Sequence, residues 1–280
     1  MKITTLENSS TTDEIVDCFN EAFSDYIIPL QLRKEHLETK IASENVQFSL
    51  SVGAFKNDKL IGFMLHCVDA INGEKVLYNA GTGVIPTERG NNYTAKMYQF
   101  LIPQLPDNDI SKIKLEVIAE NKPALKTYQN TGFTTVRDLN CYKGIVELNE
   151  ASSKFKILHL SAYDWTVLKS FWDCEPSFQN SIMVVDNLFA TNISIGIFDD
   201  ELLIGYLIYN PASKRIHQFA VSKSYRNKGV ATQLFQYVAG NYSAEITVIN
   251  VDGSSEGTNK FLESVGLKYF IKQYEMECQL

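Results

Sequence analysis

The chain has 280 residues, 45% of them hydrophobic, and a formal net charge of −7 at pH 7. A chain of this size can bury one large core or two cores of ordinary size. No basic stretch stands out among its 26 Lys and Arg residues, so we expect no DNA or RNA partner.

The cysteines and histidines suggest neither a disulfide framework nor a metal site. The five cysteines are scattered and form no CxxC pair, which favours reduced thiols in a cytoplasmic protein. The four histidines lack metal-ligand spacing, so we expect no metal. The longest apolar run, 202–209, is too short to span a bilayer, so we expect no membrane partner. The sequence leaves the oligomeric state open.

In the first half, apolar periodicity predicts a mixed series of strands and helices. Thr12 is typical of a helix start, and Asn57 with Asp58 predicts a hairpin turn between two apolar runs. Gly81 and Gly83 interrupt a strand pattern, which indicates a bulge or a close backbone approach. The expected strands are 2–6, 48–55, 60–68, 75–84, 112–118 and 133–143. The expected helices follow Thr12, cover 33–45, follow residue 92 and cover 122–130.

The second half repeats this order of elements. We expect strands at 155–160, 193–198, 202–209, 215–221, 245–249 and 268–277, and helices at 163–172, 178–188, from 230 onwards and at 256–265. Local sequence repeats as well, since 60–63 resembles 203–206, Arg89 resembles Arg226, and 132–133 resembles 266–267. These offsets of 134 to 143 residues predict an internal duplication. We therefore expect two domains, 1–147 and 154–280, separated by a polar boundary.

A cationic turn in the second half leads from an expected strand directly into an expected helix. A helix N-terminus has unpaired N–H groups and the positive end of the helix dipole, which suit a phosphate or diphosphate. Gly229 lets the backbone approach such an anion, and Ala231 leaves the next turn unobstructed. The expected binding residues are Arg226, Asn227, Lys228, Gly229, Val230 and Ala231. An altered copy of this loop lies at 89–94.

These elements and motifs together resemble the GNAT superfamily of N-acetyltransferases in both halves. The second half contains the acetyl-CoA loop of the family in full, as Val221-x-x-x-Tyr225-Arg226-x-Lys228-Gly229-x-Ala231. The first half contains Val84-x-Pro86-x-x-Arg89-Gly90 and then Asn121-x-Pro123-Ala124-x-x-x-Tyr128-x-x-x-Gly132-Phe133, which fits the second signature of the family. The resemblance implies an α/β (mixed α+β) fold of two tandem domains. Each would be a splayed mixed β-sheet flanked by helices, with the cofactor in the opening.

The resemblance also implies a reaction, in which acetyl-CoA acetylates a primary amine of a small molecule or peptide. It adds Val84, Arg89, Gly90, Asn92, Thr94, Asn121 and Val221 to the expected cofactor-binding residues. Tyr128 is the candidate general acid for the departing thiolate. Glu116 and Glu120, expected on one face of the strand before Asn121, are candidate bases.

Each half departs from the family pattern at a different place. In the first half, Asn92 stands where the loop glycine belongs and Thr94 replaces the small final residue. Asn tolerates left-handed backbone angles better than most residues, so the turn can be kept. In the second half, Leu262 aligns with Tyr128, and either Asn250 or Ser255 aligns with Asn121.

These departures lead us to expect the chemistry in the first half and cofactor binding without turnover in the second. One alternative places the chemistry in the second half. Another is a catalytically silent sensor or scaffold that binds CoA, which a fold resemblance alone does not exclude.

Overall fold

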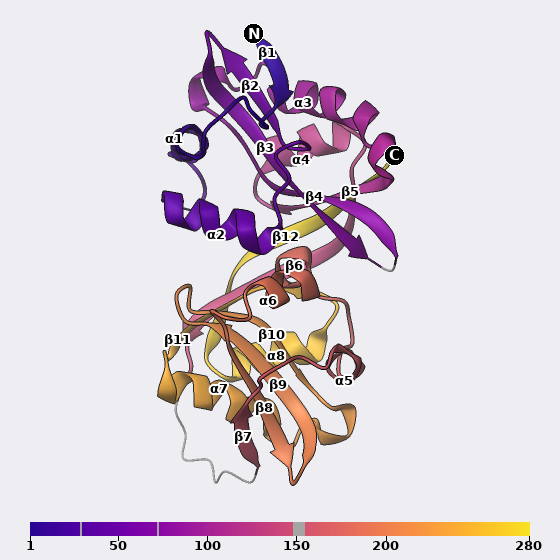
Figure 1. Cartoon of the computed structure of the whole chain (residues 1–280). Helices are drawn as coiled ribbons and strands as arrows, with labels where there is room; N and C mark the ends of the chain where they lie inside the picture. The colour runs from indigo at the N-terminus through magenta and orange to yellow at the C-terminus, as the bar shows by residue number, and fades with distance from the viewer. Residues whose placement is uncertain (29, 72, 148–154) are drawn as a thin grey trace. The chain divides into compact units, whose positions relative to one another are not determined.

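A computed structural model describes residues 1–28, 30–71, 73–147 and 155–280 (Figure 1). The chain forms two compact units, one made of Met1–Val136 with Tyr274–Leu280 and the other of Arg137–Gln273. The segment 274–280 therefore belongs to the first unit, whereas a division into contiguous halves assigns it to the second. The expected boundary, 148–154, lies outside the described residues, and the division at 147 and 154 stays a prediction.

The first unit contains the helices and strands of the first half and the end of the last strand. Its elements are β1 (Lys2–Thr5), α1 (Thr12–Ala22), α2 (Lys34–Glu44), β2 (Val52–Lys56), β3 (Lys59–Ile71), β4 (Glu74–Val84), α3 (Tyr93–Leu101), β5 (Ile110–Ile118) and α4 (Lys122–Asn130). Strand β6 (Thr134–Ile145) leaves this unit, and β12 (Leu267–Gln279) returns to it.

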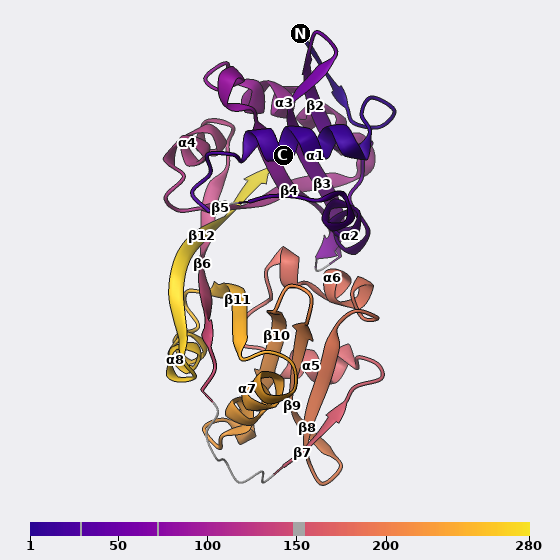
Figure 2. The same ribbon diagram turned by 90° about the vertical axis from the view of Figure 1, so that its left-hand side faces the viewer.

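The sheet of the first unit is mixed, and its two parallel strands separate partway along. Its strand order is β1-β2-β3-β4-β5-β12, with antiparallel pairs from β1 to β4. Strands β4 and β5 are parallel and pair from Lys75 with Ile110 as far as Asn79 with Leu115. Beyond that point the strands diverge, as the resemblance predicts. Figures 1 and 2 show α1 on one face of this sheet and α3 on the other.

The second unit repeats this architecture. Its elements are most of β6, then β7 (Lys156–His159), α5 (Trp165–Ser170), α6 (Ile182–Asn187), β8 (Ile193–Asp199), β9 (Leu202–Asn210), β10 (Arg215–Val221), α7 (Val230–Asn241), β11 (Glu245–Asp252), α8 (Glu256–Ser264) and the first part of β12. The parallel strands β10 and β11 pair only at Arg215 with Thr247 and at Ile216 with Val248. The splay therefore recurs in the second sheet.

Residues of β9 show how helices cover both faces of the second sheet. Leu207 and Tyr209 pack in the core that includes Leu234 of α7, and Tyr206 and Ile208 pack in the cluster that includes Leu168 of α5. Such alternation is what a strand buried on both faces requires.

Most expected elements are confirmed, and most of the differences lie at element ends. The strand expected at 48–55 begins only at Val52, because residues before it form a turn closed by the Leu50 N–H to Gln47 carbonyl bond. The helix expected at 178–188 is a 3₁₀ turn, Phe178–Asn180, followed by α6, whose start is capped by Ser181. At the hairpin turn, Asn57 and Asp58 both have positive φ, as a tight two-residue turn requires.

Candidate active site

The loop before α7 has the backbone conformation of an anion-binding turn. Asn227 and Gly229 are left-handed, with φ of 59° and 79°, and Gly229 directly precedes the first helical residue. The first N–H groups of α7 have no partner within the helix and carry its positive dipole end. A Cβ placed on Gly229 would meet no atom within 4 Å, so the backbone borders open space here. The loop therefore fits a diphosphate held by backbone amides.

The loop before α3 repeats this conformation with its glycine and asparagine exchanged. Gly90 has φ 81° and Asn92 has φ 59°, at the positions of Asn227 and Gly229. Asn92 directly precedes the first residue of α3, and its side chain makes no capping bond. The loop therefore keeps its shape without the expected glycine.

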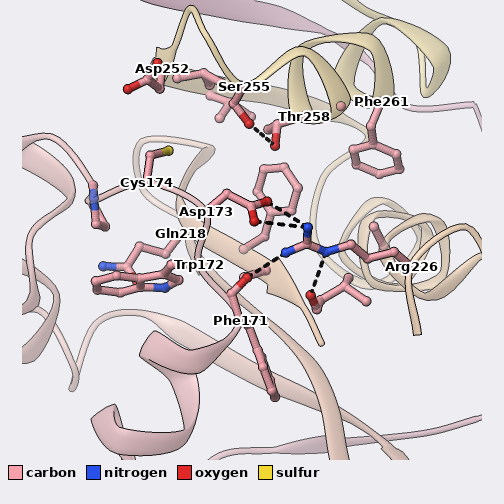
Figure 3. Close-up of a pocket in the computed structure, with 18 of the residues that line it drawn as sticks. Phe171, Trp172, Asp173, Cys174, Gln218, Arg226, Asp252, Ser255, Thr258 and Phe261 are labelled. Carbon is pink, nitrogen blue, oxygen red and sulfur yellow. Dashed lines mark hydrogen bonds and ion pairs between the residues drawn. The ribbon is translucent and has the colours of Figure 1, made fainter. Parts of the chain in front are cut away.

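Arg226 of the second loop makes contacts within the protein through all three guanidinium nitrogens (Figure 3). Its Nη1 lies 2.8 Å from a carboxylate oxygen of Asp173, and its Nη2 donates to the Phe171 carbonyl at 2.9 Å. Its Nε donates to the Val221 carbonyl at 3.3 Å. The guanidinium therefore holds the loop in place.

Arg89 makes the same set of contacts in the first unit. It forms an ion pair with Asp25 at 2.7 Å and donates to the carbonyls of Ala22 at 2.7 Å and Val84 at 3.2 Å. Hydrogen bonding to Arg89 lowers the pKa of the exposed Asp25 carboxyl. Both expected cofactor-binding arginines are thus occupied by protein groups, and the backbone of each loop is left for an anion.

A cavity of about 860 Å³ opens in the second unit where β10 and β11 diverge (Figure 3). Its wall includes the loop and first turn of α7, the start of α8, and the segment 171–176 after α5. This volume lies within the roughly 300–1,000 Å³ of small-molecule sites. The expected residues Val221, Arg226, Asn227, Gly229, Val230 and Ala231 all line it. Lys228 is exposed and lies over the ring of Tyr225.

A chain of hydrogen bonds fixes the floor of this cavity. The Trp172 indole donates to the Tyr206 hydroxyl at 2.5 Å, and that hydroxyl donates to the Gln218 amide oxygen at 2.9 Å. The Gln218 amide nitrogen donates to the Asn180 carbonyl at 2.5 Å. Burial raises the pKa of Tyr206, which keeps its hydroxyl protonated. The Gln218 side chain is therefore held, and it stands where the first unit has Gly81.

Both splayed sheets carry a bulge beside the splay. In β4 the pairing with β3 skips Ala80, and in β10 the pairing with β9 skips His217. His217 is 9% exposed, lines the cavity and has its pKa lowered to about 3, mainly by burial and also by Arg215. A neutral imidazole at the bulge follows from this pKa.

The first unit places Tyr128 beside its splay. It is buried, and its ring packs edge-on against Tyr98, whose hydroxyl accepts a hydrogen bond from the Asn79 amide at 2.7 Å. Burial raises the pKa of Tyr128 to about 12. The Thr82 hydroxyl donates to the Asn79 amide oxygen at 3.1 Å, and the same oxygen accepts the Gly81 N–H at 3.0 Å. Asn79 is the last β4 residue that pairs with β5. Tyr128 thus keeps its proton and packs against Tyr98, which is bonded to the residue at which the strands part.

The two candidate bases lie in different environments. Glu116 is half-buried, follows the last paired residue of β5 and accepts a hydrogen bond from the Tyr78 hydroxyl at 3.0 Å. Glu120 is exposed and lies after β5, which ends at Ile118. The expectation that both share one face of the strand is therefore wrong. The chain turns after Ile118, where the Asn121 N–H bonds to the Ile118 carbonyl at 2.9 Å, because Asn121 begins the next helix.

Asn121 caps α4 through its side-chain oxygen, which accepts the Ala124 N–H at 3.2 Å. Its backbone angles, φ −78° and ψ 69°, recur almost unchanged at Ser255, with φ −79° and ψ 70°. Ser255, and not Asn250, is therefore the residue of the second half that corresponds to Asn121. By the same alignment Leu262 corresponds to Tyr128. In the paired strands Val248 corresponds to Leu115, so Ile249 stands at the position of Glu116.

Leu262 is fully buried in the core of the second unit, so no hydroxyl takes the place of the tyrosine at this position. Sequence reasoning missed Asp173, Trp172, Gln218 and Thr82. A position-by-position comparison of the two halves around Gly81 would have pointed to Gln218.

Within the described part of the chain, no group of three or more His, Cys, Asp or Glu residues is arranged to hold a metal ion. Nor does any helix in the described ranges combine the length and apolar character that a membrane span needs.

Comparison with known proteins identifies the family to which these two units belong. The profile of the acetyltransferase (GNAT) family matches residues 10–133 and 164–266, so the chain belongs to this family. No curated protein matches its sequence.

Solved structures share the fold over almost the whole chain. A GCN5-related N-acetyltransferase from Sphaerobacter thermophilus is 13% identical with a TM-score of 0.74, covering 99% of this chain and 95% of that one. A tandem GNAT protein from the clavulanic acid biosynthesis pathway is 8% identical, also with a TM-score of 0.74, covering 99% and 98%. The chain is thus a GNAT acetyltransferase with tandem domains.

Proposed function

We propose that this protein transfers the acetyl group of acetyl-CoA to a primary amine, and that the first unit carries out the chemistry. The observation that carries this assignment is a difference between the units. Tyr128 and Glu116 lie beside the splay of the first unit, whereas Leu262 and Ile249 stand at the matching positions of the second. Neither a leucine nor an isoleucine side chain can serve as acid or base.

Acetyl-CoA supplies an acetyl group that is activated as a thioester, and the loop backbones suit its diphosphate. In the first unit the N–H groups after Asn92 bind the anion, and in the second those after Gly229 do so. The left-handed residues in both loops and the cavity beside the second loop support this fit.

Two residues of the first unit move protons in this proposal. The acceptor amine has an ordinary pKa near ~10.4, so it arrives protonated and Glu116 removes the proton from its nitrogen. The neutral nitrogen bonds to the carbonyl carbon as the carbon–sulfur bond breaks, and the Tyr128 hydroxyl gives its proton to the sulfur. The nitrogen then loses its second proton, which restores the Tyr128 hydroxyl. The raised pKa of Tyr128, about 12, keeps this hydroxyl protonated until it is needed.

The second unit binds acetyl-CoA or CoA without turnover in this proposal, since Gln218 and Leu262 stand where the first unit has Gly81 and Tyr128. The cavity of about 860 Å³ supports a second candidate, in which the second unit also acetylates an amine with a different acid.

The first experiment is a calorimetric titration of the full chain with acetyl-CoA, followed by a panel of amines assayed by release of free thiol. Polyamines, aminoglycosides, amino acids and peptide N-termini form the panel. We expect binding at two sites and thiol release with at least one amine class. Binding without any thiol release would favour the silent sensor, and the absence of any binding contradicts the proposed function.

A further inference from the structure

Two matching clasps hold the diphosphate-binding loops. Each consists of one arginine, the carboxylate of one aspartate, the carbonyl at the end of the first helix of the unit, and the carbonyl at the end of the strand before the loop. Arg226, Asp173, Phe171 and Val221 form the second, and Arg89, Asp25, Ala22 and Val84 form the first.

The partners of each arginine lie on segments that are distant in sequence. Ala22 ends α1, and Phe171 follows α5, so the guanidinium satisfies a carbonyl that its helix leaves unpaired. A cation at a helix C-terminus also interacts favourably with the helix dipole. The clasp therefore joins a helix end, a strand end and the loop at one point.

The aspartates orient these arginines. Asp173 approaches Nη1 of Arg226 with both carboxylate oxygens, at 2.8 and 3.1 Å, while Nη2 and Nε keep their bonds to the two carbonyls. A planar guanidinium has a fixed fork, so setting one nitrogen sets the direction of the others. The aspartate also neutralises the arginine, which leaves the loop amides as the groups that meet an anion.

We propose that Asp25 and Asp173 are positioning residues for acetyl-CoA binding. Each acts through its arginine to hold the loop in its left-handed conformation, and neither contacts the cofactor. This inference rests on the proposed function. In the second unit it has a further consequence, because segment 171–176 and the α7 loop line the same cavity. Fixing the loop therefore also fixes the opposite wall of the cavity.

The test measures acetyl-CoA affinity by calorimetry in full-length Asp173→Asn. The ion pair is half-exposed, with side chains 35% and 51% accessible, so we expect affinity at the second site to fall about two- to fivefold. Arg226→Gln loses the carbonyl contacts as well, and its affinity falls about tenfold or more. Glu245→Gln is the matched control, since it removes another exposed ion pair of this unit, to Lys214, away from the cavity.

A double-mutant cycle separates positioning from a general structural effect. If the aspartate acts through the arginine, Asp173→Asn causes no further loss in the Arg226→Gln background. Asp173→Glu keeps a carboxylate and restores part of the affinity. Thermal unfolding of each variant is followed in parallel, and we expect Asp173→Asn to unfold at the same temperature as the Glu245→Gln control.

The first unit gives an independent kinetic measurement. For Asp25→Asn we expect the KM for acetyl-CoA to rise about two- to fivefold with kcat unchanged, because the aspartate affects binding and not the chemical step. Asp13→Asn, which breaks the exposed pair with Lys34, is its control. Wild-type affinity in Asp173→Asn, or additive losses in the double variant, overturns the inference while leaving the proposed function intact. If the wild-type chain itself binds no acetyl-CoA, the proposed function fails first.

Discussion

Asn92 and Gly229 adopt the same left-handed backbone conformation, each directly before the first residue of a helix. Their φ angles are 59° and 79°. For most L-residues this conformation costs about 1–2 kcal/mol, and asparagine is one of the few that visit it routinely. The substitution in the first loop therefore changes the side chain and keeps the turn.

This relationship predicts how substitutions at either loop behave. Gly229→Asn should retain the stability of the wild-type chain, since the first unit already uses that residue, whereas Gly229→Ala should lose about 1–2 kcal/mol of unfolding free energy. In the first loop, Asn92→Gly should be tolerated and Asn92→Ala should not. Urea unfolding of the four variants measures this. Equal losses in Gly229→Asn and Gly229→Ala would show that the left-handed angle is not what the position requires.

Tyr128→Phe should reduce kcat by about 10²-fold or more, with little change in the KM for acetyl-CoA. The phenyl ring retains the packing against Phe133 and Tyr98 and loses only the hydroxyl. Because the pKa of Tyr128 is about 12, the wild-type chain should show no alkaline loss of kcat from this group below about pH 11. Tyr242→Phe, in an exposed position of the second unit, is the control. Steady-state kinetics with the most active amine decides the matter, and an unchanged kcat would move the chemistry away from Tyr128.

The sequence predicted the loops well because their signals are local. In each loop the left-handed residue, Gly229 or Asn92, lies between a strand and a helix that are adjacent in sequence. Spacing alone therefore indicates the turn. The similar offsets between the two halves then extended the assignment from one loop to the other. Tyr128 was found in the same way, from a motif contained within a single helix and its two ends.

The long-range relationships were not predictable in this way. Nothing in the local pattern links Asp173 to Arg226, because the pair forms only once α5 and β10 have packed. The end of β12 belongs with the first unit for a similar reason, since an alternating strand pattern does not specify its neighbour. Glu120 was assigned to a strand that ends two residues earlier, and element ends are the least certain part of any such pattern.

His217 predicts a specific dependence of stability on pH. Its pKa is lowered from 6.5 to about 3 by burial, so in the folded chain it stays neutral while the unfolded chain binds a proton. The unfolded state therefore binds more protons between these two values. Its contribution to stability is complete above about pH 6.5 and is lost as the pH falls towards 3.

The measurement is urea unfolding between pH 4 and 7. The slope of the unfolding free energy against pH should be shallower in His217→Gln than in the wild-type chain, by at most about 1.4 kcal/mol per pH unit. This holds even where the substitution also changes the stability at pH 7. His159→Gln, the same change at an exposed histidine of the same unit, is the control. If plots of unfolding free energy against pH are parallel for wild type and His217→Gln, the imidazole has the same pKa in the folded and unfolded states.

The choice between Glu116 and Glu120 as the base follows from where β4 and β5 part. Glu116 comes directly after Leu115, the last paired residue of β5, and it accepts a hydrogen bond from Tyr78. Glu120 is exposed in the turn before α4. Glu116→Gln keeps an oxygen for the Tyr78 hydroxyl and removes the basic carboxylate, so kcat should fall about 10²-fold with folding preserved. Glu120→Gln, the same chemical change at the exposed position, should alter kcat less than twofold by the usual standard for surface substitutions. Rates measured from pH 6 to 9 show whether the defect of Glu116→Gln diminishes as the fraction of unprotonated amine in solution rises. The reverse ranking of the two variants would assign the base to Glu120.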